Sequence, residues 1–163
     1  MRLALMIIDM QKAFYEGKSK DSMEAAVEYI LAAVEMFRKK NLPIIWVQDK
    51  EDVVPGDAGF ELIDQLIPQE NDYRIIKEYG NSFNKTECLK IVRDERIDTL
   101  ILSGYCAEYC VLSTYRGALD LDIAPIIFRG SIASGVQENI RFVESISDIA
   151  SYGVLKKLVA ESQ

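Results

Sequence analysis

The chain has 163 residues, of which 49% are hydrophobic and 28% charged, a size and balance that exclude a disordered segment and predict one globular domain over residues 1–163. Its formal net charge of -7 repels phosphate backbones and anionic lipids, so we expect neither nucleic acid nor membrane as a partner. No apolar run reaches the roughly 18–20 residues that span a bilayer. The apolar stretch that follows Arg2 ends at Asp9 rather than at a small-residue cleavage site, which predicts a cytoplasmic protein.

The first half of the chain alternates short apolar runs with one long helical pattern. Residues 3–8 form a continuous apolar run, as expected of a strand buried on both faces. Apolar side chains at helical spacing then predict a helix over residues 22–40, whose basic last residues suit the negative end of a helix. In chain order there follow a strand over residues 43–47, a loop over 49–59, a short helix over 61–67 and a weaker strand over 73–77.

The second half repeats this alternation. A helix over residues 84–95, with Asn84 as its N-cap, precedes a strong strand over residues 98–103 that Gly104 closes. Next come a helix over 107–121, a strand over 124–128, a helix over 136–150, and a terminal strand or helical turn over 153–159. Strands separated by helices require crossover connections. The sequence therefore predicts a single-domain, three-layer α/β/α fold with a mostly parallel, Rossmann-like sheet.

Side chains capable of chemistry follow several of these strands. In open parallel sheets, ligands bind at the carboxyl ends of the strands, near the point where the strand order reverses. Asp9 follows the first predicted strand, Asp49 the second, Lys77 ends the third, and residues 106–110 follow the fourth. We therefore expect these residues at one edge of the sheet.

The chain has no histidine and three cysteines, so its chemistry must use carboxylates, thiols, lysines or tyrosines. Cys110 lies in the first turn of a predicted helix, where the backbone N–H groups favour a thiolate. Lys77 can add positive charge there, and Asp9 can move the proton that a histidine carries in other enzymes. Taken singly, each of the three also fits an ordinary structural role, and Cys88 on its helix is interpreted as a core residue.

Three segments resemble the isochorismatase-like cysteine hydrolases. Residues 7–14 read Ile-Ile-Asp-Met-Gln-Lys-Ala-Phe, residues 77–83 read Lys-Glu-Tyr-Gly-Asn-Ser-Phe, and residues 104–114 read Gly-Tyr-Cys-Ala-Glu-Tyr-Cys-Val-Leu-Ser-Thr. They match the family's opening Asp-x-Gln, its lysine segment and its nucleophile segment, in the same order. The resemblance extends from Leu3 to about Val159 and includes residues 131–134 and the helix after Gln137.

This resemblance implies a catalytic triad of Asp9, Lys77 and Cys110. It also implies a cis peptide between Tyr105 and Cys106, which aims the backbone N–H of Cys106, with that of Cys110, at a common point as an oxyanion hole. The expected reaction is the hydrolysis of a C–N bond in a small amide or carbamoyl compound through a Cys110 thioester. Family members often form dimers or tetramers, so we expect a homo-oligomer and a small-molecule amide as the partners.

The sequence departs from the family in its metal site and in Cys106. Nicotinamidase-type members bind a metal through an aspartate and histidines after the second strand, whereas here Asp49 and Asp52 stand without any histidine. Oxygen ligands of this kind can hold a hard cation, but a solvated loop is the interpretation we favour. We therefore predict neither metal nor cofactor. Cys106 stands where a thiol is unusual, either as a small tolerated residue or as a redox partner of Cys110.

The sequence leaves the substrate open. Aromatic residues near the expected site suggest a small pocket with aromatic walls, formed by Phe14, Tyr15, Trp46, Phe83, Tyr105 and Tyr109. Two alternatives to a hydrolase remain at this stage. One is a thiol redox or oxidative-stress protein that uses Cys106 and Cys110, and the other is a catalytically idle scaffold that keeps the family fold.

Overall fold

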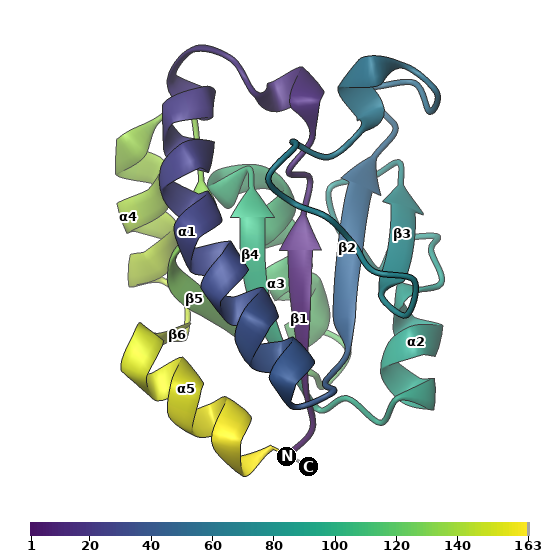
Figure 1. The fold of residues 1–163 in the computed structure, drawn as a ribbon, viewed down its shortest axis with the longest axis vertical. Coiled ribbons are helices and arrows are strands. Elements are labelled where there is room, and N and C mark those ends of the chain that lie inside the picture. The colour runs from purple at the N-terminus through teal and green to yellow at the C-terminus, as the bar shows by residue number, and fades with distance from the viewer. Residues whose placement is uncertain (163) are drawn as a thin grey trace.

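The computed structural model describes residues 1–162, which build a sheet with helices on both faces (Figure 1). Within these residues the sheet has six strands, all pairing in parallel, in the order β3-β2-β1-β4-β5-β6. The strands are β1 (Leu3–Ile8), β2 (Ile44–Asp49), β3 (Tyr73–Lys77), β4 (Thr99–Tyr105), β5 (Ala124–Ala133) and β6 (Ile149–Ala150). The helices are α1 (Gly17–Lys39), α2 (Cys88–Asp94), α3 (Leu112–Leu119), α4 (Gln137–Ser145) and α5 (Tyr152–Glu161). The predicted α/β class is confirmed.

Two apolar clusters, one on each face of the sheet, hold the layers together. The side chains of β1 alternate between them: Leu3, Leu5 and Ile7 pack with α1 and α5, and the residues between them pack with α2, α3 and α4. This double burial explains why β1 is apolar at every position. Cys88 is buried in the second cluster, in agreement with its predicted structural role.

The strand order places the reversal point between β1 and β4. From β1 the chain moves to β2 and β3 on one side, and it returns to β4, β5 and β6 on the other. The two connections therefore diverge at the carboxyl ends of β1 and β4, where such sheets bind ligands. In Figure 1 these ends lie at the top of the sheet, whereas α5 and both termini lie at the bottom.

The helix predicted over residues 61–67 is absent from the structure. Backbone groups of this segment bond instead to the segment after β1: Lys12 N–H donates to Glu61 O at 2.9 Å, and Ile63 N–H to Met10 O at 3.0 Å. Pro68 lacks the N–H that a continuing helix needs. Tertiary pairing therefore overrides the local helical pattern.

Other element boundaries shift for local reasons. The helix expected from residue 84 begins at Cys88, because Lys85 has a left-handed backbone with φ of 55°. The helix expected over 136–150 ends at Ser145, because Ile149 and Ala150 pair with β5. The terminal segment is the helix α5, with Ser151 as its N-cap. No helix in residues 1–162 has the length and apolarity required to cross a membrane.

Candidate active site

Three adjacent strand ends bring two carboxylates and one ammonium group into contact. Asp9 directly follows β1, and Asp49 and Lys77 are register partners at the ends of β2 and β3. The Lys77 Nζ lies 2.8 Å from Asp9 Oδ2 and 2.6 Å from Asp49 Oδ2. All three side chains are almost completely buried. The ammonium is therefore held between two carboxylates away from bulk water.

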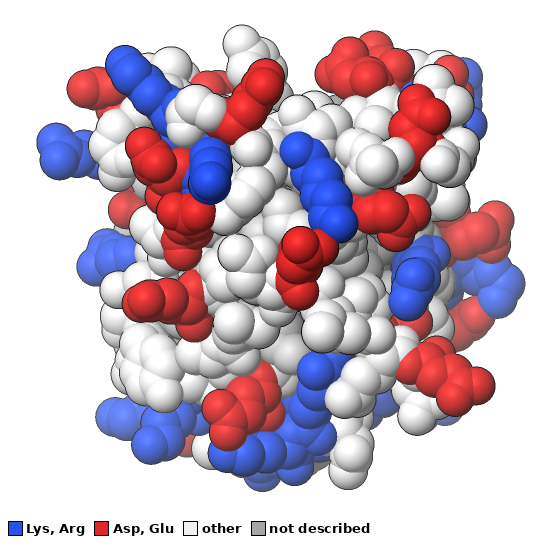
Figure 2. Space-filling model, turned by 45° about the horizontal axis from the view of Figure 1, so that its top comes forward, with Lys and Arg blue, Asp and Glu red and all other residues white. Residues whose placement is uncertain are grey.

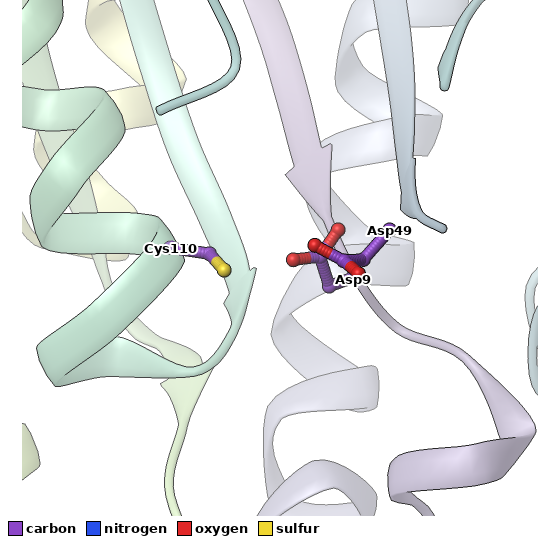
Figure 3. A group of neighbouring side chains, drawn as sticks. All are labelled: Asp9, Asp49 and Cys110. Carbon is purple, nitrogen blue, oxygen red and sulfur yellow. The ribbon is translucent and has the colours of Figure 1, made fainter. Parts of the chain in front are cut away.

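Cys110 reaches this cluster from the segment after β4. A cis peptide joins Tyr105 and Cys106, and a π-helical turn over Ala107–Val111 then leads into α3. The Lys77 Nζ lies 3.3 Å from Cys110 Sγ. Figure 3 shows the Cys110 sulfur facing the carboxylates of Asp9 and Asp49 across the gap between β4 and β1. The structure thus brings Asp9, Lys77 and Cys110 together and contains the cis peptide that the resemblance implies.

Close approach of β1 and β4 requires the glycine before the cis peptide. Gly104 is the register partner of Ile8 and has φ of 112°, a conformation that L side chains rarely adopt. A Cβ atom at this position would lie 2.1 Å from Ile8 O. Asp9, the next residue, is itself left-handed with φ of 50°. Both strand ends are therefore shaped so that Asp9 and the turn of Cys110 face each other.

Burial sets the protonation states of the two acidic groups. It raises the pKa of the Asp9 carboxyl to about 6, although the neighbouring Lys77 ammonium opposes the rise. Burial, together with the negative charge of Asp9, raises the pKa of the Cys110 thiol to about 12. At neutral pH the site therefore holds an Asp9 carboxylate beside a neutral thiol. The thiol pKa thus lies above its ordinary value rather than below it, as the helix start led us to expect, because burial and the charge of Asp9 outweigh the Lys77 ammonium.

Lys77 keeps its charge despite its burial. Burial by itself lowers the pKa of the ammonium, but the negative charge of Asp9 and the hydrogen bonds to Asp49 and Asp9 outweigh it, and the pKa rises above its usual value. A lysine in this state does not accept protons at neutral pH. Its chemical role is therefore to hold Asp9 and to offset negative charge.

Asp49 also belongs to this cluster, although the sequence had led us to interpret it as part of a solvated loop or as a ligand of a hard cation. Its Oδ1 accepts hydrogen bonds from the backbone of Glu51 at 2.8 Å and of Asp52 at 3.3 Å. Gln11, fully buried, fixes its backbone by donating to Asp49 O at 3.0 Å and accepting from Asp49 N–H at 2.7 Å. The available signal was its position: Asp49 ends β2, between the strands that carry Asp9 and Lys77.

Cys106 belongs to a separate hydrogen-bond network. Its thiol donates to Glu108 Oε2 at 3.0 Å, and burial and that carboxylate raise its pKa to about 12. Glu108 also accepts hydrogen bonds from Ser134 Oγ at 2.9 Å and Asn139 Nδ2 at 2.7 Å. Cys106 Sγ is thus bound within the Glu108 network, whereas Cys110 Sγ contacts Lys77 Nζ. This environment favours the interpretation of Cys106 as a structural residue over that of a redox partner.

A cavity of about 600 Å³ opens beside Cys110. Of the predicted aromatic wall, Phe14, Tyr105 and Tyr109 line it. Tyr15, Trp46 and Phe83 are not among its lining residues. The Trp46 indole is buried and donates to Asp72 Oδ2 at 2.9 Å, Phe83 packs against the core on the α2 side, and Tyr15 bonds Glu24 of α1. Alternation along β2 turns Trp46 toward α1 rather than toward the strand end.

The donor set at this site does not fit a metal ion. One atom each of Asp9, Asp49 and Cys110 lie within 4.8 Å of one another, which is a spacing that a metal can bridge. Lys77 Nζ, however, contacts all three side chains and remains protonated. The cation that these ligands surround is therefore the protein's own ammonium, and we derive no chemistry from a metal.

The fold and this cluster define an α/β protein with a cysteine, an aspartate and a lysine at the switch point of a parallel sheet. The family model of the isochorismatase domain matches residues 3–142, and the chain belongs to the isochorismatase family. It is 32% identical over 118 residues to a secreted isochorismatase effector of Verticillium dahliae, covering 69% of this chain and 62% of that relative. A probable inactive nicotinamidase of Arabidopsis thaliana is 26% identical over 144 residues, and the match covers 73% of this chain and 74% of that relative.

Among solved structures, the N-carbamoylsarcosine amidase from Thermoplasma acidophilum superimposes with a TM-score of 0.82. The sequence identity is 26%, and the match covers 93% of this chain and 96% of that one. The chain thus matches the whole amidase, while it spans less than two thirds of the fungal effector.

Proposed function

We propose that the protein is a cysteine hydrolase that cleaves a C–N bond of a small amide or carbamoyl compound. The observation that carries this proposal is the contact of Lys77 Nζ with Asp9, Asp49 and Cys110, three residues that line one cavity. The similarity to an amidase supports the choice of an amide. The cavity of about 600 Å³ is in the size range of small-molecule sites.

Asp9 is the general base of the proposed reaction. Its Oδ2 is bound to Lys77, while its buried Oδ1 makes no hydrogen bond within the described residues and is available to a proton. Asp9 takes the proton of the Cys110 thiol as the sulfur attacks the carbonyl carbon. Because the thiol is neutral at rest, base catalysis is required at this step.

The remaining steps follow from the same groups. The tetrahedral oxyanion accepts hydrogen bonds from the backbone N–H groups of Cys106 and Cys110. Asp9 returns the proton to the leaving amine, the C–N bond breaks, and a thioester remains on Cys110. Asp9 then takes a proton from water, which attacks the thioester. As the C–S bond breaks, Asp9 returns this proton to the Cys110 sulfur, and the acid is released. Throughout, Lys77 balances the negative charge.

The test is intact mass spectrometry of the protein after incubation with a panel of primary amides, with ammonia measured in parallel. We expect an acyl adduct on Cys110 and release of ammonia. Cys110→Ala should abolish both and lower kcat/KM by at least about 10³-fold, as the loss of a nucleophile does. Cys88→Ala, which removes a thiol from the core outside the lining of the cavity, is the matched control and should keep the activity.

Two other results would contradict the proposal. A redox protein would consume thiol equivalents without ammonia and would need both Cys106 and Cys110. A folded but inactive family member would give neither an adduct nor ammonia with any amide. The Arabidopsis relative is described as such a probable inactive protein.

A further inference from the structure

Every charged residue that lines the cavity beside Cys110 is acidic. Within the described residues the lining contains Asp9, Asp49, Glu51, Asp52 and Glu108 and neither lysine nor arginine. Lys77 is almost fully buried behind this wall. Five carboxylates against one ammonium leave four net negative charges. Figure 2 shows acidic side chains at the upper right, around the segment that follows β2, with basic side chains at their outer edge.

Glu108 is a fixed carboxylate without a cation. Its hydrogen-bond donors are the neutral groups of Cys106, Ser134 and Asn139, and no ion pair of Glu108 occurs in the part of the chain that the structure describes. Partial burial works against its charge, yet the hydrogen bonds from Cys106 and Asn139 hold its pKa below the usual value. A rigid, ionised carboxylate therefore faces the cavity with its charge unpaired.

Aromatic rings complete the wall. Phe14 and Tyr105 stack with their centroids 5.4 Å apart, and Tyr109 stands exposed at the rim. Aromatic faces and carboxylates together attract ammonium and guanidinium groups through ion pairing and cation–π contacts. Aromatic faces and carboxylates do not attract an anionic group in this way.

A second observation locates the ligand. Asp9 Oδ1 is a buried oxygen without a hydrogen bond among residues 1–162, and Asp9 lines the same cavity next to Cys110. This oxygen faces the Cys110 thiol, whose proton it is proposed to take, and it can also accept a hydrogen bond from a donor that enters the cavity. The acidic wall and the reacting groups thus belong to one binding site.

We propose that the substrate of this site is an amide that carries a positive charge, an ammonium or guanidinium group held by Glu108 and by Asp52 or Glu51 while its carbonyl carbon meets Cys110. The inference rests on the proposed function and names its substrate class. The net negative charge of the wall disfavours an amide bearing a carboxylate most, and a neutral amide of the same shape binds more weakly than a cationic one.

The charge preference is testable at Cys110 without any substrate. Cys110 is labelled with either of two methanethiosulfonates, the cationic trimethylammonioethyl or the anionic sulfonatoethyl reagent. The rate of Cys110 labelling by each is followed by peptide mass spectrometry. The thiol pKa cancels in the ratio of the two rates, and division by the same ratio for an uncharged thiol, 2-mercaptoethanol, removes the difference in reactivity between the reagents. We expect at least about a tenfold preference for the cationic reagent at low salt, in the range of electrostatic focusing in clefts. The preference should shrink at high ionic strength.

Charge-neutralising variants identify the wall. Glu108→Gln and Asp52→Asn should each lower the preference about two- to fivefold, the magnitude of a partly exposed ion pair. Glu28→Gln, which removes the same charge from the exposed face of α1, should leave it unchanged. Equal labelling by the two reagents, or a preference for the anionic one, would overturn the inference. An equal effect of Glu28→Gln would also overturn it, since net charge alone would then be responsible.

Hydrolysis separates this inference from the proposed function. Three amides of similar length are compared for ammonia release: γ-aminobutyramide (cationic), pentanamide (neutral) and succinamate (anionic). We expect kcat/KM to fall in this order. Faster cleavage of succinamate would leave a hydrolase and overturn the charged-substrate inference. A preference of Cys110 for the cationic reagent, without cleavage of any amide in a broad panel, would support a cation-binding site and overturn the proposal of a hydrolase.

Discussion

At the scale of single residues, the protonation state of Asp9 decides whether the site can react. Its carboxyl is buried beside an ammonium that is shared with Asp49, so burial dominates and the pKa rises to about 6. Above that pH Asp9 is a carboxylate able to take the thiol proton; below it Asp9 is a neutral acid that cannot. The thiol, with its pKa at about 12, supplies no thiolate of its own in this range.

We therefore predict that kcat/KM rises with pH through about 6. For a single group with this pKa, the ionised fraction increases about tenfold between pH 5 and pH 7, and the rate should follow it. The measurement is ammonia release from an amide that acylates Cys110, over this pH range. Asp9→Asn, which cannot accept the proton, should remove the activity at every pH. A rate that stays flat between pH 5 and pH 7 would exclude Asp9 as the base.

At the scale of elements, the pairing of β1 with β4 positions the reacting groups. The strand β4 ends in Gly104, whose backbone conformation and closeness to Ile8 O allow the chain to turn into the cis peptide and the π-helical turn. Asp9 directly follows Ile8, the last residue of β1. A side chain at position 104 would push these two strand ends apart.

Gly104→Ala should accordingly lower the free energy of unfolding by at least about 3 kcal/mol, because it combines a left-handed backbone with a backbone clash. Urea denaturation followed by circular dichroism measures the change. Gly153→Ala is the matched control: Gly153 lies in α5 with free space around its Cα, and alanine there should stabilise the helix by about 0.5–1 kcal/mol. Equal stability of the two variants would contradict the close approach of β1 and β4.

At the scale of the whole molecule, the site and much of the stabilising core are spatially separate. The reacting groups lie at the carboxyl ends of the strands, while α5 packs near the opposite end (Figure 1). Leu155 on α5 is fully buried in the cluster that includes α1. Loss of that packing should weaken the fold without altering the geometry around Cys110.

We expect Leu155→Ala to lower the free energy of unfolding by about 2–5 kcal/mol, through lost burial and the cavity that remains. Under conditions where the variant is folded, the rate of Cys110 labelling should equal that of the unaltered protein. Lys156→Ala, at the neighbouring exposed position, should change neither quantity by much. A change in Cys110 labelling in the folded Leu155→Ala protein would show that the two ends are coupled.

Much of this molecule could be predicted from local patterns. Continuous apolar runs indicated β1, β2 and β4, because only a strand covered on both faces is apolar at every position. The rule that ligands bind at the carboxyl ends of parallel strands then placed Asp9, Lys77 and Cys110 at one edge. The helix predicted over residues 61–67 was wrong, because pairing with the segment after β1 uses its backbone groups.

The sequence by itself determined the fold class, the order of the strands and helices along the chain, and the edge where the reactive residues meet, since each depends on periodicity and on the direction of the chain. The tertiary structure alone decided the electrostatics. Whether Asp49 pairs with Lys77, whether the thiol of Cys110 is neutral, and which aromatic rings face the cavity all depend on burial and on side-chain distances between strands far apart in sequence. Those distances arise only when the sheet has assembled.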